Sequence, residues 1–402
     1  MTPTSISARW RVLTLYALLN ALMQFQWLRF APIANDVAAQ YGVSVGTVGW
    51  LSLVFPLLFL PLALPSGAWV DRLSLRSGLR LVAGVLLAGA LLRELWPGFA
   101  GLLAGQILIA LVQPMLMSSL APLARVWFEP EQRLQATAVG TLALFVGLGA
   151  AFVLIPLSAG DVAASQSIDT IVLAIVAALV FALVPRDPPA PIGDTMAAPS
   201  GKSSARFLLT QPALLLLFAL IFIGNGFFNA LFTWIEPMLG ANGLNADAAG
   251  YVALAMLAGG VAGMVFVPAL PVLAARLRLT LSLAAALGIP LTLMLTRSNE
   301  LPLLCAIGVV LGVTMLAPLP LLLDTVSELA GDHHGGLAMS AFWLAGNAGA
   351  AAVIYALSYL ADHQLWSLAG YAFAGLLLLQ LLLVQALRVE PFKAEADRPR
   401  CQ

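Results

Sequence analysis

The residues that could take part in chemistry are mostly amides and aromatics spaced along apolar stretches of the chain. Asn225 and Asn229 are four positions apart, and Trp343 and Asn347 repeat that spacing. Residues four apart share one face of a helix. Side chains of these types hydrogen-bond and stack, so the pattern favours noncovalent binding of a small polar molecule.

Two further polar groups fit the same interpretation. Gln106 and Gln113 are seven positions apart, which is two helical turns, and Gln26, Trp27 and Arg29 lie together in the first apolar stretch. For each amide, the alternative is a helix–helix hydrogen bond worth about 0.6–2 kcal/mol. Because an intramembrane charge is costly, we expect Arg29 either to face a central cavity or to snorkel to the interface.

Two carboxylates lie near the ends of apolar stretches and are candidates for proton coupling. Glu94 closes the third stretch and Glu236 the seventh. A buried carboxylate with a raised pKa could carry a proton. The alternatives are interfacial placement for Glu94, beside Arg93, and an ion pair with Arg29 for Glu236.

The pattern does not indicate an enzyme. The sequence contains no phosphate-binding loop, no paired-cysteine motif and no His–Glu metal motif within an apolar stretch. Its two cysteines, Cys305 and Cys401, define no metal cluster. We therefore expect no catalytic residue, no metal and no cofactor, and the formal net charge of zero gives no indication of a nucleic-acid partner.

The composition predicts that this chain lies in lipid. Hydrophobic residues make up 61% and charged residues 9% of the chain, and mean hydropathy is +0.96. A soluble domain carries roughly 25% charged residues. Since about 20 apolar residues cross a bilayer, we predict twelve membrane-spanning helices, at 10–34, 45–70, 79–96, 99–126, 136–158, 168–184, 208–238, 247–275, 279–297, 300–326, 335–360 and 365–388.

The basic residues predict the orientation of these helices. With both termini cytoplasmic, sixteen of the nineteen Lys and Arg residues fall on the cytoplasmic side. The exceptions are Arg93 and Arg297, which fall outside, and Arg29, which lies within the first span. This distribution follows the positive-inside rule and supports an even number of spans.

A polar, proline-rich segment divides the chain. We predict an N-terminal half (1–184), a cytoplasmic linker (185–207), a C-terminal half (208–388) and a cytoplasmic tail (389–402), with six spans in each half.

The two halves repeat one another. Gly42, Gly49 and Trp50 recur as Gly243, Gly250 and Tyr251, at an offset of 201 residues. Two six-helix halves resemble the major facilitator fold, in which solute is held between the halves near mid-membrane. The predicted fold class is thus an all-α membrane protein with the major facilitator fold.

The loop after the second span resembles the cytoplasmic signature of the same superfamily. Gly67 is followed by Asp71 and Arg72, and then by Arg76, with Ser74 in the place of the usual small glycine. An acid there can meet the positive N-terminus of a neighbouring helix. We expect these residues to gate the cytoplasmic side; the alternative is an ordinary solvated loop.

Three segments resemble the feline leukaemia virus subgroup C receptor-related (FLVCR) branch of this superfamily. They are 20–27, 105–128 and 340–347. The resemblance implies that Trp27 and Gln113 lie in the solute cavity and that Asn347 replaces a longer glutamine. It also implies transport of choline-like amines or haem. Arg29 departs from the pattern and would suit an anionic or zwitterionic solute better than a quaternary ammonium.

The resulting prediction is a secondary transporter that moves a small organic solute by alternating access. It would be a monomeric, multi-pass protein of a bacterial inner membrane, with the lipid bilayer and the solute as its partners. The predicted solute-binding residues are Gln26, Trp27, Arg29, Gln113, Asn225, Asn229, Trp343 and Asn347. The alternatives are a proton-coupled drug or metabolite exporter, which the missing Gly-Pro pair in 136–158 disfavours, and a transporter-like receptor that does not transport.

Overall fold

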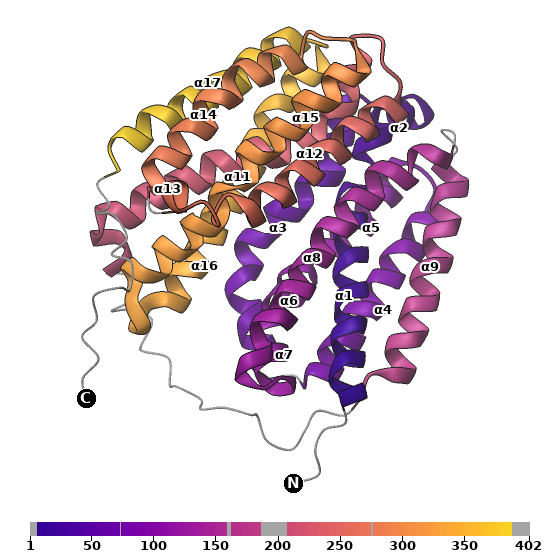
Figure 1. Ribbon diagram of the computed structural model, residues 1–402. Coiled ribbons are helices and arrows are strands. Elements are labelled where there is room, and N and C mark those ends of the chain that lie inside the picture. The colour runs from indigo at the N-terminus through magenta and orange to yellow at the C-terminus, as the bar shows by residue number, and fades with distance from the viewer. Residues whose placement is uncertain (1–5, 73, 159–161, 186–206, 275, 388–402) are drawn as a thin grey trace, which may run out of the picture.

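The computed structural model describes residues 6–72, 74–158, 162–185, 207–274 and 276–387, and within these ranges the chain is helical with no strand (Figure 1). The long helices of the N-terminal half are α1 (Ile6–Leu28), α3 (Val45–Arg72), α4 (Leu75–Leu95), α8 (Pro130–Leu154) and α9 (Val162–Leu183). Those of the C-terminal half are α11 (Pro212–Gly240), α12 (Ala246–Phe266), α14 (Leu277–Leu295), α15 (Leu301–Leu316), α16 (Pro318–Asp362) and α17 (Trp366–Gln385). The shorter elements are η1 (Ala31–Ile33), α2 (Ala34–Tyr41), α5 (Phe99–Ala110), α6 (Gln113–Ser118), α7 (Leu120–Trp127), η2 (Pro156–Ser158) and α13 (Pro271–Ala274).

Eleven segments of the described chain are long and apolar enough to cross a membrane, and they match eleven of the predicted spans. The remaining predicted span, α1, has 23 residues but is less apolar. Its buried amides Asn20, Gln24 and Gln26 lower its hydropathy. Since these amides are buried inside the N-terminal half, α1 completes the predicted twelve-helix arrangement as an interior helix.

Two predicted spans are not continuous helices. Segment 99–126 consists of α5, α6 and α7, and α6 begins at Gln113-Pro114, where the missing N–H of proline costs no helical hydrogen bond. Segment 300–326 is likewise interrupted at Ala317, before Pro318. The predicted break between 326 and 335 is wrong for the backbone, because α16 continues through it, although the apolar segments still end at Ala330 and resume at Leu337. Hydropathy indicates where polar residues interrupt a span, and the backbone can remain helical there.

The predicted repeat has a structural counterpart. Gly42 and Gly243 both adopt positive φ, at 64° and 86°, which favours glycine. Gly49 of α3 packs against the ring of Trp234 in α11, and Gly250 of α12 packs against the backbone of Phe152 in α8. The paired glycines therefore allow close contact between opposite halves.

Within each half, another glycine allows two helices to touch. A Cβ on Gly147 of α8 would overlap the carbonyl of Ala21 in α1, and a Cβ on Gly349 of α16 would overlap the carbonyl of Phe222 in α11. Small residues of this kind let transmembrane helices approach closely.

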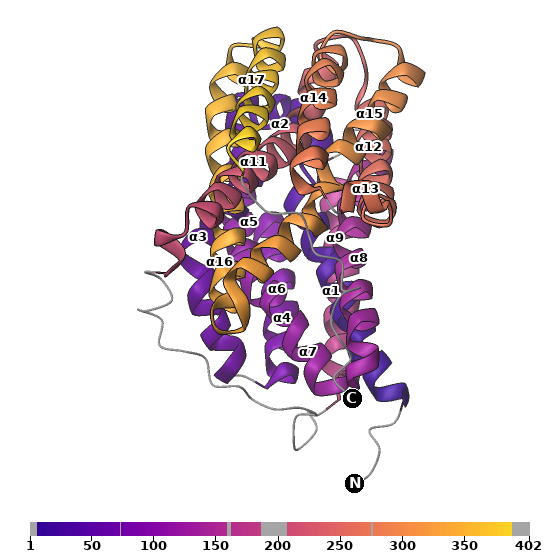
Figure 2. The same cartoon turned by 60° about the vertical axis from the view of Figure 1, so that its left-hand side comes forward.

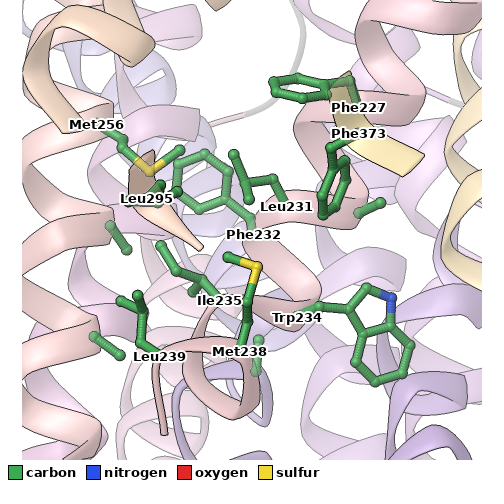
Figure 3. Packing of buried hydrophobic residues seen from close by; sticks show 14 of the residues in the cluster. Phe227, Leu231, Phe232, Trp234, Ile235, Met238, Leu239, Met256, Leu295 and Phe373 are labelled. Atoms are coloured by element: carbon green, nitrogen blue, oxygen red, sulfur yellow. The ribbon is translucent and has the colours of Figure 1, made fainter. Parts of the chain in front are cut away.

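An apolar cluster joins the halves near α2. Phe152 of α8 packs edge-on against Phe232 of α11, with ring centroids 5.5 Å apart. Figure 3 shows Phe232 among the α11 side chains Leu231, Ile235 and Met238, which belong to the same cluster as Leu28 and Leu53 of the N-terminal half. In both views α2 lies at one end of the bundle and α7 at the other (Figure 1, Figure 2). We call these the α2 end and the α7 end.

Replacing either close-contact glycine with alanine should lower stability. We expect Gly147→Ala and Gly349→Ala each to lose about 1–3 kcal/mol, since the added methyl group forces two backbones apart. Apparent melting temperature in detergent is the measurement. Gly375→Ala is the control, because a Cβ at Gly375 meets nothing within 4 Å; equal melting temperatures for all three variants would contradict the close-contact account.

Candidate solute-binding and gating site

Asp169 of α9 lies at the centre of a buried ion network. Its Oδ2 accepts hydrogen bonds from Arg29 Nη1 at 2.5 Å and from Arg93 Nη2 at 2.8 Å. Its Oδ1 accepts one from Gln26 Nε2 at 2.5 Å. Asp169 is 5% exposed, Arg93 4%, and Arg29 and Gln26 0%. Helices α1, α4 and α9 are thus tied together through one carboxylate.

Gln106 of α5 extends the network to α3. Its Oε1 accepts from Arg93 Nη1 at 3.0 Å, and its Nε2 donates to the carbonyls of Gln26 and Leu51 at 3.0 and 3.1 Å. Arg29 Nη2 also donates to Ser165 Oγ at 3.0 Å. Both Nη atoms of each guanidinium group therefore donate hydrogen bonds within the N-terminal half.

This network corrects three expectations. Arg29 neither faces a cavity nor snorkels, because it is fully buried and paired with Asp169 rather than with Glu236. Arg93, expected outside, is buried, while its neighbour Glu94 is exposed. Gln26 and Arg29 are therefore buried in hydrogen bonds to Asp169 in this conformation.

Sequence reasoning missed Asp169. The signal was available, since Asp169 is the sole charged residue of the predicted span 168–184. An ionisable residue within a span pairs with another charge or a polar group. Its partners lie 140 and 76 positions away, so the pairing itself could not be read from spacing.

Trp27 and Gln113 remain compatible with a role in solute binding. Trp27 is half-buried, donates from Nε1 to the carbonyl of Ser52 at 3.0 Å and stacks on Phe55 with centroids 6.2 Å apart. Gln113, 3% exposed, opens α6, and its amide has no hydrogen-bond partner in the described ranges. The Gln113 amide and the exposed part of the Trp27 ring are therefore the groups that a solute could contact.

The predicted residues of the C-terminal half divide into two groups. Asn225 and Trp343 line a cavity of about 50 Å³ together with Phe228 and Gln380. Asn229 Nδ2 donates to the carbonyl of Asn225 at 2.8 Å, and Asn347 Nδ2 donates to that of Trp343 at 2.9 Å. These two amides thus bond within their own helices and not across helices.

Glu236 joins the halves at the α2 end. Its carboxylate accepts from the backbone N–H of Asn35 at 3.1 Å and from Asn35 Nδ2 at 2.9 Å, at the start of α2. Asp362, at the end of α16, accepts from the backbone N–H of Gly46 at 2.7 Å, at the start of α3. These two carboxylates of the C-terminal half are thus placed at helix N-termini of the N-terminal half, where negative charge is stabilised. We call these two contacts the carboxylate caps.

The predicted gate at the other end is only partly described. The side chains of Gly67, Asp71 and Arg72 lie outside the described residues, although the backbone of α3 extends to Arg72. Arg76 is half-buried in the first turn of α4. Gating by these four residues stays a prediction. In the described part of the chain, no group of three or more His, Cys, Asp or Glu side chains could hold a metal ion.

Comparison with known proteins gives a family and a fold. Residues 13–354 match the Major Facilitator Superfamily model. Solute carrier family 49 member A3 of Danio rerio is 32% identical over 270 residues, covering 63% of this chain and 57% of that protein. The choline/ethanolamine transporter FLVCR1 of Mus musculus is 32% identical over 151 residues, covering 36% of this chain and 26% of that protein.

The chain spans about half the length of the first curated relatives that it matches, 57% and 52%. Among solved structures, a bacterial homologue of the human lysosomal transporter Spinster has a TM-score of 0.74 at 15% identity, covering 96% of this chain and all of that one. That similarity concerns the fold alone.

The ion network predicts an unequal response to charge removal. It contains two cations and one anion, so Asp169→Asn leaves two buried guanidinium groups without a counter-charge, whereas Arg29→Met leaves the Arg93–Asp169 pair neutral. We expect Asp169→Asn to cost about 3–5 kcal/mol and Arg29→Met clearly less. The double variant should recover part of the loss. Apparent melting temperatures of the four proteins measure this, and a larger loss for Arg29→Met would contradict it.

Proposed function

The chain belongs to the Major Facilitator Superfamily, and from that premise we propose that it is a secondary transporter of a small amine solute that works by alternating access. The similarity to the FLVCR branch, predicted from helices one, four and eleven, is confirmed by the curated relatives. The observation that carries the proposal is the burial of the Arg29 side chain and its pairing with Asp169. With this side chain buried and paired, the rest of the predicted solute site is uncharged.

The uncharged residues suit an amine. Trp27 and Trp343 are half-buried aromatics, and Gln113, Asn225 and Asn347 supply amides. Aromatic faces attract ammonium groups, and amide oxygens accept hydrogen bonds from hydroxyl or ammonium groups. The objection that an exposed arginine would repel a cation no longer applies. Choline and ethanolamine, which the names of the FLVCR relatives give as their substrates, are therefore the first solutes to test.

The carboxylate caps support an assignment of conformation. Because Glu236 and Asp362 bridge the halves at the α2 end, we propose that this end is closed and faces the outside of the cell. The positive-inside rule supports that orientation, with both termini and the α7 end on the cytoplasmic side of the cytoplasmic membrane. Solute would then enter this state from the α7 end, and opening the α2 end would break both caps.

Proton coupling is a second candidate, favoured by the position of Glu236. This carboxylate is 6% exposed and lies at a junction that must separate during transport. Protonation would remove the charge that the N-terminus of α2 stabilises, and so would loosen the closed end. Glu94 is exposed and outside that junction, which disfavours it as a carrier of protons. A receptor that binds amines without transport would show binding but no uptake.

The solute site predicts loss of amine uptake on side-chain truncation. We expect Trp27→Ala and Gln113→Ala to lower uptake of choline and ethanolamine into proteoliposomes, roughly tenfold for Trp27→Ala given about 0.5–2 kcal/mol per cation–π contact. Trp27→Phe should retain most activity. Leu382→Ala, in an exposed position on α17, is the control for expression and reconstitution. If the wild-type protein takes up neither amine, the solute class is refuted. If both alanine variants keep full activity, the proposed site is refuted.

The caps predict a change in accessibility. Glu236→Gln should weaken the closed α2 end by about 0.3–2 kcal/mol and expose residues beneath it. Thr233 is buried at the contact between the halves. The rate at which a membrane-impermeant maleimide labels a Thr233→Cys variant therefore measures opening of the α2 end. The background protein lacks Cys305 and Cys401. We expect faster labelling with Glu236→Gln and no change with Glu94→Gln. Equal rates in all three backgrounds would count against a gating role.

A further inference from the structure

Gln380 of α17 is a buried amide that neither the fold nor the predicted site accounts for. The side chain is 8% exposed, and its Oε1 is buried with no hydrogen-bond partner in the described part of the protein. Oε1 lies beside α11, since a Cβ built on Gly224 would stand 4.0 Å from it. A buried carbonyl left without a donor costs about 1–3 kcal/mol.

The cavity that Gln380 lines has the size of a very small group. Its volume is about 50 Å³, and a cavity needs about 10–15 Å³ to hold one water molecule. The lining offers the amides of Asn225 and Gln380 and the rings of Phe228 and Trp343, and the remaining lining residues are aliphatic or glycine. The cavity has room for a hydroxyl or a primary ammonium group.

The neighbours of the cavity connect it to the proposed solute site. Asn225 and Trp343, both half-buried, belong to the residues that the sequence places in that site. Gln380 lines the same cavity from the last helix, so a polar group that enters the cavity can reach its unpaired carbonyl. A membrane hydrocarbon cannot donate a hydrogen bond, whereas a polar solute can.

We propose that this cavity is a subsite that receives the hydrogen-bond donor of the transported solute, a hydroxyl or a primary ammonium group, on Gln380 Oε1. The inference rests on the proposed function, because it assigns the residue that binds one end of the same solute. Trp27 and the other aromatics then hold the remainder of the molecule. Gln380 selects solutes that carry a donor, since an analogue without one leaves the buried carbonyl unpaired.

The first experiment compares two probes that differ in the donor alone. Choline and ethyltrimethylammonium carry the same trimethylammonium group and the same charge, and the second has a hydrogen atom in place of the hydroxyl group. We expect wild-type protein to bind choline about tenfold more tightly, as the pairing of one buried hydrogen bond implies. Calorimetric or competition binding to purified protein measures the ratio of affinities.

The variants separate a hydrogen bond from a packing effect. Gln380→Met keeps the length of the side chain and removes the acceptor, so it should abolish the preference while leaving ethyltrimethylammonium binding unchanged. Gln380→Glu keeps an acceptor and should retain the preference. Gly224→Ala narrows the cavity without a clash and should reduce the preference for choline. Gly375→Ala, which lies on α17 with Gln380, is the control. A preference that survives in Gln380→Met, or is lost in Gln380→Glu, would overturn the proposal.

A structural readout distinguishes failure of the subsite from failure of the proposed function. If neither amine is taken up, the solute class proposed above fails on its own. Density maps of the protein with and without ethanolamine then test the cavity directly. Probe density against Gln380 that is absent in Gln380→Met supports the subsite, and an ordered water only, with ethanolamine present, refutes it.

Discussion

The pairing of Asp169 with two arginines is the interaction on which the N-terminal half depends. A charge in the interior of a membrane protein is tolerated only when a counter-charge and hydrogen bonds replace its lost hydration. Asp169 supplies the counter-charge for both Arg29 and Arg93, and Gln26 and Gln106 add hydrogen bonds to Asp169 and Arg93. Because these residues come from α1, α4, α5 and α9, their helices cannot separate without exposing a charge to lipid or to an apolar core.

The same constraint explains how the two halves relate. Within a half, ionic contacts and close glycine contacts, such as Gly147 against α1, resist relative movement of helices. Between the halves, the α2 end is joined by the carboxylate caps and by an apolar cluster that includes Phe152 and Phe232. The interaction of a charge with a helix N-terminus stabilises the closed end by at most about 2 kcal/mol. Loss of one partner from a buried ion pair costs more, about 3–5 kcal/mol. This difference supports the proposal that the two halves move as units about the α2 end.

Burial of the arginines also changes the chemistry expected of the solute. Arg29 stands two residues from Trp27 and, from sequence alone, argued against a cation. In the structure its charge is compensated within the N-terminal half, and the other residues of the proposed solute site are aromatics and amides. Gln380 adds an amide from α17, a helix for which the sequence pattern indicated no role in binding. Aromatic faces and unpaired carbonyls together suit a small amine with a donor at one end.

The sequence by itself determined the class of protein, the number of spans and the repeat of Gly42 and Gly243, because hydropathy and turn conformation depend on residues close together in the chain. It also singled out Trp27, Gln113, Asn225 and Trp343, since polar and aromatic side chains in apolar stretches are conspicuous. Only the tertiary structure decided that Arg29 pairs with Asp169, that Glu236 caps α2, and that Gln380 shares a cavity with Asn225. The physical reason is that burial, ion pairing and cavity shape depend on which helices lie side by side, and those helices are separated by scores of residues in the chain.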